Sequence, residues 1–292
     1  MLVKFAVIAG SASKDLGKRI ARRLKAPYVE AKTRVFPDGE SKITFGRIPK
    51  NSVVLVVQST YPPVDTNLLQ ALSIISQARN VSSKIYAVIP YMGYARQDRQ
   101  FLSGEVVTMA IVARMLQTAG AKKIIAVDIH SKIALNHFKI PKENVSAIPE
   151  LAKYFKKMKL KNALVVSPDM GGALRAKKFA SLLNTDFITL KKSRNRKTGK
   201  VMIQSSKVDV RGKDLILVDD IISTGGSVIK AAQFLKRQKC KRVFVACTHG
   251  LFVEGAEKKI KKAGVARIIS TNTIPRNTSK VDVSGVIADS IR

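Results

Sequence analysis

The segment of the chain best suited to chemistry begins apolar and ends polar. Leu215–Val218 reads as a buried strand, and Asp219 and Asp220 follow it directly. Glycines let a backbone approach an anion, and the N–H groups at a helix N-terminus carry partial positive charge. Both features occur in the loop that leads into the next predicted helix, which consists of Ser223, Thr224, Gly225, Gly226 and Ser227 after two isoleucines. The spacing therefore predicts a phosphate site in this loop.

The two acids need a separate explanation, because a phosphate would repel them. Asp219 and Asp220 are suited to accept hydrogen bonds from the hydroxyls of a sugar, or to bridge a metal ion. A strand end with acids at an N-cap and a glycine turn is the purely structural alternative. The chain has no GxxxxGK[ST] pattern, which disfavours an ordinary P-loop kinase.

Two segments of the N-terminal half place aromatic, acidic or basic side chains close together. Phe36, Asp38 and Glu40 place an aromatic ring and two acids within five residues, although FPDGE alone reads as a turn. Further along, Arg96 can hold phosphate oxygens through paired hydrogen bonds, and Gln97 can bond the nucleotide. Taken alone, that segment reads as the solvated start of a helix.

Two predicted strand ends carry candidate metal ligands. Asp128 and His130 are two residues apart, so a continuing strand would place them on one face, where they could bind a metal or a triphosphate. Asp169 follows another apolar run and precedes Gly171 and Gly172. It is a candidate metal or ribose ligand. A structural histidine and a turn are the alternatives.

A basic run from Lys191 to Lys197 is predicted to form an exposed hairpin or loop. Such runs are usually solvated surface. A cationic pair that closes over a diphosphate is nevertheless what phosphoryl transfer requires, because positioning and charge stabilisation lower its barrier. The register of such a pair is open by two residues, because Arg196 and Lys197 follow Lys192 and Arg194 in the same run.

Together these segments resemble ribose-phosphate pyrophosphokinases over essentially the full length of the chain. The Asp219–Ser227 segment resembles the phosphoribosyl pyrophosphate loop, which phosphoribosyltransferases share with the pyrophosphokinases. The other segments favour the pyrophosphokinases. The resemblance implies a transferase that moves the β,γ-diphosphate of ATP to the 1-hydroxyl of ribose 5-phosphate. The products are phosphoribosyl pyrophosphate, for nucleotide biosynthesis, and AMP.

The resemblance also implies roles for individual residues, with Mg²⁺ as the cofactor. The catalytic pair is Lys192 and Arg194. ATP binding is assigned to Phe36, Asp38, Glu40, Arg96, Gln97 and His130. Ribose 5-phosphate binding is assigned to Asp169, Asp219, Asp220, Ser223, Thr224, Gly225, Gly226 and Ser227. The metal ligands are Asp128, His130 and Asp169. In the family, the loop of Phe36 often completes the ATP site of a neighbouring subunit, so a homodimer or larger homo-oligomer is expected.

One segment departs from part of the family. Gln100–Glu105 is short and lacks the Ser/Arg-rich stretch of members that phosphate activates and ADP inhibits, so the chain resembles archaeal members. ADP is therefore expected to act only as a competitor of ATP. Two rivals stay open, a phosphoribosyltransferase and an inactive regulatory homologue. Formation of AMP separates the first, and the presence of His130, the acid pair and the basic loop argues against the second.

Short apolar runs alternate with segments of helical period, which predicts an α/β protein. We expect two tandem phosphoribosyltransferase-type domains, each a mostly parallel sheet flanked by helices: an ATP-side domain of residues 1–145 and a C-terminal domain of residues 146–292. The predicted strands are Phe5–Ala9, Val53–Val57, Ile85–Ile89, Ile124–Val127, Ala163–Val166, Asp186–Leu190, Asp214–Val218, Val243–Thr248 and Arg267–Ser270. The predicted helices are Leu16–Leu24, Thr66–Arg79, Glu105–Ala119, Glu150–Lys159 and Val283–Ile291, the last placed to pack back on the first domain.

The composition is strongly basic, with 53 Lys and Arg against 20 Asp and Glu, a formal net charge of +33. An anionic partner is implied. Nucleic acid is not expected as the main one, because the basic residues are spread along the chain and the densest run, Lys191–Lys200, has no interleaved aromatic residues. Cys240 and Cys247 show no metal-site or disulfide pattern, and no apolar run reaches about 18 residues. No membrane association and a cytoplasmic location are expected.

Overall fold

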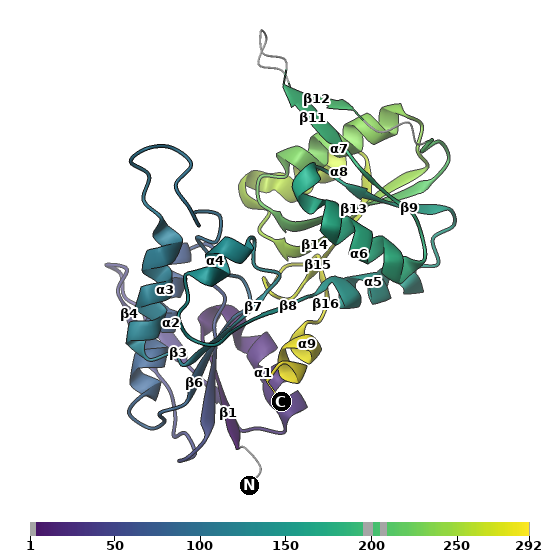
Figure 1. Cartoon of the computed structure of the whole chain (residues 1–292). Coiled ribbons are helices and arrows are strands. Elements are labelled where there is room, and N and C mark those ends of the chain that lie inside the picture. The colour runs from purple at the N-terminus through teal and green to yellow at the C-terminus, as the bar shows by residue number, and fades with distance from the viewer. Residues whose placement is uncertain (1–3, 195–200, 205–208, 292) are drawn as a thin grey trace. The chain divides into compact units, whose positions relative to one another are not determined.

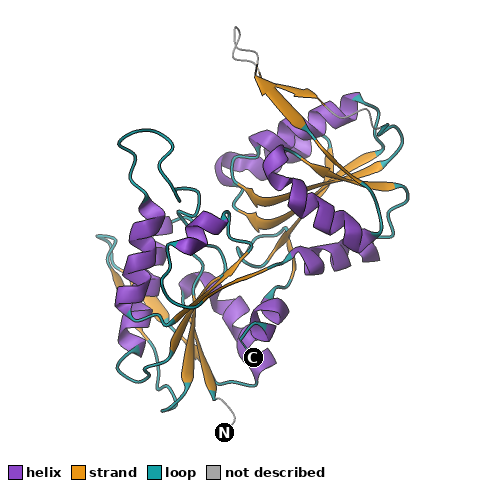
Figure 2. Cartoon of the chain, viewed as in Figure 1, coloured by secondary structure: helices purple, strands orange, loops and turns teal. Residues whose placement is uncertain are grey.

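The computed structural model describes residues 4–194, 201–204 and 209–291. The chain folds as two compact units. Unit 1 comprises Met1–Ser146, Asn272–Pro275 and Asp282–Arg292, and unit 2 comprises Ala147–Thr271 and Arg276–Val281. Figure 2 shows that each unit has its own sheet with helices beside it. Among the described residues, no helix is long and apolar enough to cross a membrane.

The sheet of unit 1 consists of β1 (Phe5–Ala9), β2 (Tyr28–Glu30), β5 (Val53–Val57), β6 (Ile85–Ile89), β7 (Lys123–Val127) and β8 (Lys142–Val145). All pairings are parallel, in the order β2-β1-β5-β6-β7-β8. Every residue of β5 is buried, as expected for a central strand with both faces covered. The helices are α1 (Lys14–Leu24), α2 (Val64–Ala78), α3 (Thr108–Ala119), α4 (Lys132–Asn136) and α9 (Ser284–Asp289). A separate antiparallel hairpin is formed by β3 (Lys32–Val35) and β4 (Ser41–Thr44).

The sheet of unit 2 consists of β9 (Ala163–Ser167), β10 (Phe187–Thr189), β13 (Asp214–Ile222), β14 (Arg242–Gly250), β15 (Val265–Thr271) and β16 (Ser279–Val281). It is also parallel throughout, in the order β10-β9-β13-β14-β15-β16. The helices are α5 (Ile148–Lys157), α6 (Ala173–Leu183), α7 (Gly226–Arg237) and α8 (Ala256–Lys262). A second antiparallel hairpin, β11 (Lys191–Arg194) and β12 (Val201–Gln204), projects from this unit (Figure 1).

The two units share one topology. In each sheet the second strand along the chain lies at one edge beside the first, and the remaining four follow in chain order on the other side. In each unit a two-stranded hairpin is inserted after the second strand. This agreement of the strand order and of the inserted hairpin is the pattern that duplication of one domain would produce. The observed fold class is α/β, with two tandem domains that each contain a parallel sheet flanked by helices.

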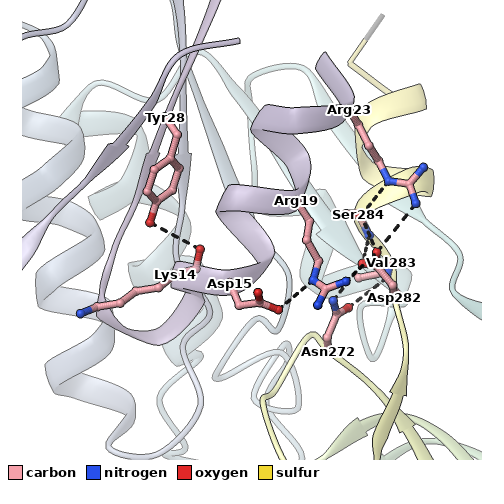
Figure 3. A network of polar contacts seen from close by, with 9 residues as sticks. All are labelled: Lys14, Asp15, Arg19, Arg23, Tyr28, Asn272, Asp282, Val283 and Ser284. Carbon is pink, nitrogen blue, oxygen red and sulfur yellow. Dashed lines mark hydrogen bonds and ion pairs between the residues drawn. The ribbon is translucent and has the colours of Figure 1, made fainter. Parts of the chain in front are cut away.

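The end of the chain belongs to unit 1, where it packs on the first helix. Asp282 lies at the centre of this contact (Figure 3). Its carboxylate accepts from Ser284 N at 2.9 Å and from Asn272 Nδ2 at 2.9 Å, and it lies 3.6 Å from Arg19 Nη1 and 3.8 Å from Arg23 Nη2. Burial alone would raise the pKa of Asp282, but these hydrogen bonds and the Arg19 charge hold it below its usual value.

Most predicted elements are present with small shifts at their ends, and three differences affect the site. Glu105 does not begin a helix, because its Oε2 accepts from Phe101 N at 2.8 Å and Leu102 N at 3.1 Å, which closes a turn before α3 starts at Thr108. β13 continues to Ile222, beyond the predicted end at Val218. The third difference follows β7, which ends at Val127 as predicted. Asp128 has a left-handed φ of 37°, so the alternation expected for Asp128 and His130 does not apply.

Candidate active site

Asp219 and Asp220 lie inside β13, not after it as the sequence suggested. The strand pairs with β9 only as far as Leu217 but with β14 as far as Ile222, so its last residues run along one neighbour alone. Asp219 Oδ1 accepts from Asp220 N at 2.9 Å, and Asp220 Oδ1 accepts from Ile221 N at 2.9 Å. Both carboxylates are thereby oriented by their own backbone at the carboxyl end of a central strand.

Arg175 completes this acid pair, and the sequence analysis missed it. Its Nη1 lies 3.4 Å from Asp219 Oδ1 and its Nη2 lies 3.0 Å from Asp220 Oδ2. Arg175 reaches the acids from α6, past Gly172, where a Cβ would lie 2.7 Å from Ser167 Oγ and 3.3 Å from Arg175 Nη1. An arginine in the first turn of a helix that follows a strand end and two glycines was the available signal.

The environment of the acid pair favours its protonated form. Burial, followed by the charge of Asp220, raises the pKa of Asp219 to about 8, and Arg175 opposes this rise. Near neutral pH, Asp219 can therefore carry a proton and donate a hydrogen bond, whereas an ionised carboxylate only accepts. This pair can present a donor and acceptors to the hydroxyls of a sugar.

The loop from Ser223 to Ser227 connects β13 to α7. Gly225 has a φ of +77°, and a Cβ there would lie 2.9 Å from Ile260 Cδ1, so the turn requires glycine. Gly226, the first residue of α7, faces open space, because no described atom other than those of its chain neighbours and of the backbone of its own helix lies within 4 Å of where a Cβ would be. The N-cap residue of this twelve-residue helix, Gly225, makes no side-chain capping hydrogen bond. An anion can therefore approach the backbone at Gly226.

Asp169 begins the adjacent loop, at the end of β9. Its Oδ1 accepts from Gly172 N at 3.2 Å, and its backbone oxygen accepts from Ser167 Oγ at 2.7 Å. These bonds fix the turn before α6, and this helix places Arg175 against the acid pair. In unit 2 the structure thus brings Asp169, the acid pair and the glycine loop to the carboxyl ends of adjacent strands, where ligands bind in open α/β sheets.

The predicted ATP segment of unit 1 borders a cavity of about 380 Å³ lined by Arg96, Gln97, Arg99, Phe101, Glu105 and Val106. Arg96 and Gln97 are exposed. Gln97 is held by the start of α3, because its Oε1 accepts from Thr108 Oγ1 at 3.0 Å and its backbone oxygen from Met109 N at 3.1 Å. The segment is a series of turns and not the start of a helix.

Asp98 ties the ATP segment to the loop of His130, which the sequence analysis did not anticipate. Its side chain is only 4% exposed and accepts a hydrogen bond from Ser131 Oγ. Its backbone oxygen accepts from His137 Nε2 at 2.7 Å. An acid between the bases Arg96 and Arg99 was the only signal in the sequence. Asp98 therefore fixes the position of one half of the predicted ATP site against the other.

Asp128 and His130 lie just beyond the end of β7, at the carboxyl end of the sheet of unit 1. The prediction that strand alternation places both residues on one face is wrong. Asp128 has a left-handed φ, so the strand ends before either residue. Asp128 is half-buried and His130 is exposed. Ile129 N donates to Asn144 Oδ1 at 2.9 Å, which holds the loop between them.

The remaining candidates lie on the two hairpins. Phe36–Glu40 forms the turn of β3–β4, closed by a hydrogen bond from Phe36 N to Glu40 O at 2.8 Å, with Asp38 and Glu40 exposed. Lys192 and Arg194 lie in β11, opposite Ile203 and Val201 of β12. Arg196 and Lys197 lie outside the described residues.

The candidate ligands of Mg²⁺ come from both units, with Asp128 and His130 in unit 1 and Asp169 in unit 2. Over the described residues, no group of three or more His, Cys, Asp or Glu side chains that could hold a metal ion is found. Mg²⁺ is commonly held by one or two carboxylates together with substrate phosphates and water. The carboxylates of Asp128 and Asp169 are of the type that this mode requires.

Comparison with known proteins identifies the family. Residues 5–120 match the family model of the N-terminal domain of ribose phosphate pyrophosphokinase, and residues 140–285 match the phosphoribosyl transferase domain. The chain belongs to the ribose-phosphate pyrophosphokinase family. A ribose-phosphate pyrophosphokinase of Sulfurisphaera tokodaii is 37% identical over 290 residues, covering 98% of this chain and 99% of the relative. One of Methanobrevibacter smithii is 38% identical over 301 residues, covering 98% and 99%.

The tertiary structure leads to the same family. The crystal structure of phosphoribosylpyrophosphate synthetase from Mycobacterium smegmatis matches with a TM-score of 0.87 at 29% identity, covering 99% of this chain and 98% of that one. The family, the enzyme class and the fold class predicted from the sequence are therefore confirmed, and archaeal proteins are among the relatives. The roles assigned to individual residues stay predictions.

Proposed function

We propose that this pyrophosphokinase forms phosphoribosyl pyrophosphate and AMP from ATP and ribose 5-phosphate with the residues described above. The observation that carries the assignment is the arrangement at the end of β13. An acid pair held by Arg175 lies beside a glycine loop whose helix start is open to an anion. The loop suits the 5-phosphate and the acid pair suits the ribose hydroxyls. Both groups belong to one molecule of ribose 5-phosphate.

The nucleotide is assigned to unit 1. Arg96 and Gln97 line the cavity and would hold the triphosphate with His130. Phe36, Asp38 and Glu40 would contact the adenine of a neighbouring subunit. In the reaction, the anomeric oxygen forms a bond to the β-phosphorus, and the bond from that phosphorus to the oxygen of the α-phosphate breaks. AMP leaves and the hydroxyl proton is released to solvent. Lys192 and Arg194 would stabilise the charge that shifts toward AMP.

Asp128, His130 and Asp169 are proposed to hold Mg²⁺ together with the substrate phosphates. When bound, the metal supplies positive charge to phosphate oxygens. Activity should require Mg²⁺ or Mn²⁺ and cease in excess EDTA. Full turnover in EDTA would contradict the metal assignment and leave the substrate assignment standing.

The decisive experiment is detection of AMP by ³¹P NMR in the presence of ATP, Mg²⁺ and ribose 5-phosphate. AMP should form only when ribose 5-phosphate is present, together with phosphoribosyl pyrophosphate. A phosphoribosyltransferase would instead consume phosphoribosyl pyrophosphate and a base without forming AMP from ATP. An inactive regulatory homologue would form neither product.

The assembly, the regulation and the location complete the proposal. The enzyme should sediment as a dimer or larger, because the Phe36 loop is assigned to a neighbour's site. An active 32 kDa monomer would refute that role. ADP should compete with ATP, and free phosphate should not be needed. Non-competitive inhibition by ADP would refute this expectation. A cytoplasmic site of action is proposed for an enzyme with these substrates.

A further inference from the structure

The positive charge of the chain is concentrated in unit 2. This unit contains 30 Lys and Arg and 9 Asp and Glu residues, whereas unit 1 contains 23 and 11. The formal net charge is therefore +21 for unit 2 and +12 for unit 1, although unit 2 is the shorter. The proposed substrate site uses only three cations of unit 2, namely Arg175, Lys192 and Arg194. Most of the excess charge serves no role in the reaction.

Fourteen of the cations of unit 2 fall in four short segments that contain no acid: residues 156–161, 211–213, 236–242 and 259–262. Each segment lies just before β9, β13, β14 or β15, and three of them include the end of α5, α7 or α8. Because the strands are parallel, all four segments meet at the amino-terminal edge of the sheet. The proposed substrate site lies at the opposite, carboxyl edge. We call the four segments the basic edge.

Hydrogen bonds join neighbouring segments of the basic edge. Gly212 N donates to Lys239 O at 3.1 Å, and Lys241 N donates to Lys213 O at 2.9 Å. Lys236 Nζ donates to Lys241 O at 3.3 Å. The side chain of Lys236 also lies along the turn after α8, where a Cβ on Gly264 would be 3.3 Å from Lys236 Cε. The segments before β13, β14 and β15 therefore form a continuous surface.

The cations of the basic edge are directed to solvent. Thirteen of the fourteen belong to exposed residues, and Lys213 is half-buried. Two of them lie in ion pairs: Arg242 Nη2 is 2.6 Å from the buried Asp214, and Lys261 Nζ is 2.8 Å from Glu257. Even with these two charges neutralised, a strongly positive surface remains.

Helix stabilisation explains only part of this pattern. Lysines in the last turn of a helix stabilise it by about 0.3–1 kcal/mol each, through the helix dipole, which accounts for Lys156, Lys157 and Lys236. Lys161, Lys239 and others lie beyond the helices and gain little from the dipole, which acts only within the last turn. Like charges closer than the Debye length of about 8 Å repel one another. A bound polyanion would remove this repulsion.

We propose that, in addition to its enzymatic activity, the chain binds double-stranded nucleic acid on the basic edge through the phosphates, without reading the sequence. Four adjacent strands at about 4.8 Å spacing span about 15 Å. A duplex of that length carries about nine charges, at one per ~1.7 Å. Single strands are bound largely by stacking on aromatic rings, and the four segments contain none. The duplex is therefore the better fit.

The test measures binding of the full-length protein to a fluorescein-labelled 20-base-pair DNA duplex of arbitrary sequence, by anisotropy between 50 and 300 mM NaCl. The basic-edge variant replaces Lys157, Lys239, Lys241 and Lys262 with Gln. The control variant replaces Lys50, Lys84, Lys122 and Lys139 with Gln. These exposed lysines precede strands β5 to β8 of unit 1, so the control removes the same charge from the same topological position.

The basic-edge variant should bind at least tenfold more weakly at 100 mM NaCl. Its slope of log K against log salt should be smaller by about 3.6, since each of the four lysines contributes one phosphate contact and about 0.9 to the slope. The control should bind within about threefold of wild type. Both variants should keep the wild-type kcat. Saturating ATP and ribose 5-phosphate should not displace the duplex, because the substrates occupy the opposite edge of the sheet.

Several results would overturn the proposal. Equal weakening in both variants would assign binding to net charge alone. Displacement by substrates would assign it to the active site. Absence of binding by the wild type at 50 mM NaCl would show that double-stranded nucleic acid is not a partner of the protein. Binding to vesicles containing phosphatidylserine, without binding to the duplex, would replace nucleic acid with a membrane surface.

Discussion

The third strand of each sheet ends in a different way, although the two units share one topology. Counted from the strand start, Gln58 and Ser59 of unit 1 occupy the places of Asp219 and Asp220 in unit 2. Gln58 and Ser59 are fully buried. Gln58 Oε1 accepts from Ala12 N at 3.0 Å, and Ser59 Oγ accepts from Tyr91 N at 3.1 Å and donates to Thr273 O at 2.6 Å.

This difference shows that the same strand end can form either a binding site or a set of internal hydrogen bonds that stabilises the protein. We call the internal set in unit 1 the brace. In unit 1 the polar groups at the strand end satisfy one another and position the backbone that leads to Gly93, whose N–H donates to Thr60 Oγ1 at 2.7 Å. In unit 2 the corresponding loop has an open glycine at Gly226 and a pair of acids. Polar groups that already form hydrogen bonds within the protein are not available to bind a ligand. At the end of this third strand, a phosphate site is therefore expected in unit 2 and not in unit 1.

The two hairpins extend the comparison. Substitutions in the β11–β12 hairpin should give the largest effect on the rate of the reaction. Lys192→Ala and Arg194→Ala in β11–β12 should each lower kcat at least about 10²-fold, with KM for ATP changed less than about tenfold, because a transition-state contact affects kcat and not binding. For scale, an arginine supplied to a phosphoryl transition state contributes about 10³ to 10⁵ in rate. Steady-state kinetics of each variant would measure this.

Arg196→Ala is the control for the register of this hairpin. It should leave kcat within a few fold of wild type. If Arg196→Ala were the severe variant while Arg194→Ala kept near-normal turnover, the catalytic assignment would have to move by two residues. Phe36→Ala in the other hairpin should instead raise KM for ATP, because that hairpin is assigned to binding.

A substitution at Gly226, the open glycine, should give the next largest effect, on KM for ribose 5-phosphate. Gly226→Ala places a methyl group at the helix start without a clash with the described residues. Ala is also favoured over Gly inside helices by about 1 kcal/mol. KM for ribose 5-phosphate should rise at least about tenfold, since a phosphate held by backbone N–H groups needs close approach, while Tm should not fall. Initial rates and thermal unfolding would separate the two effects.

Gly225→Ala serves as the contrasting variant. Its φ of +77° and the approach of Ile260 Cδ1 to 2.9 Å predict loss of stability as well as of binding. An unchanged KM for ribose 5-phosphate in Gly226→Ala would show that the anion does not bind at this helix start.

A substitution in the brace of unit 1 should lower the stability of the protein, whereas a substitution at the matching loop of unit 2 should not. Ser59→Ala removes the acceptor of Tyr91 N and the donor to Thr273 O inside the protein, which should cost about 1–3 kcal/mol of the free energy of unfolding. Ser223→Ala in unit 2, at a half-exposed position, should change stability by less than about 0.5 kcal/mol. Urea denaturation of both variants tests the contrast. Equal losses would mean that the loop of unit 2 is braced as well.

The last predicted effect is a difference in pH dependence. A pKa of Asp219 raised to about 8 means that the folded state holds a proton that the unfolded state releases near pH 4. The contribution of this group to stability is therefore fully present below about pH 4 and is lost as the pH rises toward about 8. Asp219→Asn should flatten the decline of Tm between pH 5 and 8 relative to wild type.

Gln58→Glu supplies the comparison in unit 1. It introduces an acid at the corresponding buried position, where Gln58 Nε2 now donates to Asn67 Oδ1 at 3.2 Å. This variant should acquire a pH-dependent loss of stability that wild-type unit 1 lacks at this position. If the Tm of wild type and Asp219→Asn ran parallel from pH 5 to 8, the acid pair would be ionised throughout that range.

The sequence was sufficient for the features that local chemistry controls. Buried parallel strands such as Val53–Val57 are apolar along their whole length, and Gly225 before α7 permits a turn that few other residues adopt. These patterns predicted the α/β fold, most of the elements and the candidate loop of residues 223–227. The family followed from the motifs taken together, since each motif alone also reads as a turn or a solvated surface.

Only the tertiary structure decided the contacts between distant residues. Arg175 meets Asp219 and Asp220 from another helix, and Asp98 meets Ser131 from another loop. Strand pairing with β14 carried the acid pair inside β13, and a left-handed φ at Asp128 ended β7 before the predicted alternation could apply. Sequence patterns report what neighbouring residues prefer. Packing between segments, which neither segment encodes alone, determines which side chains meet and which backbone groups stay open to a ligand.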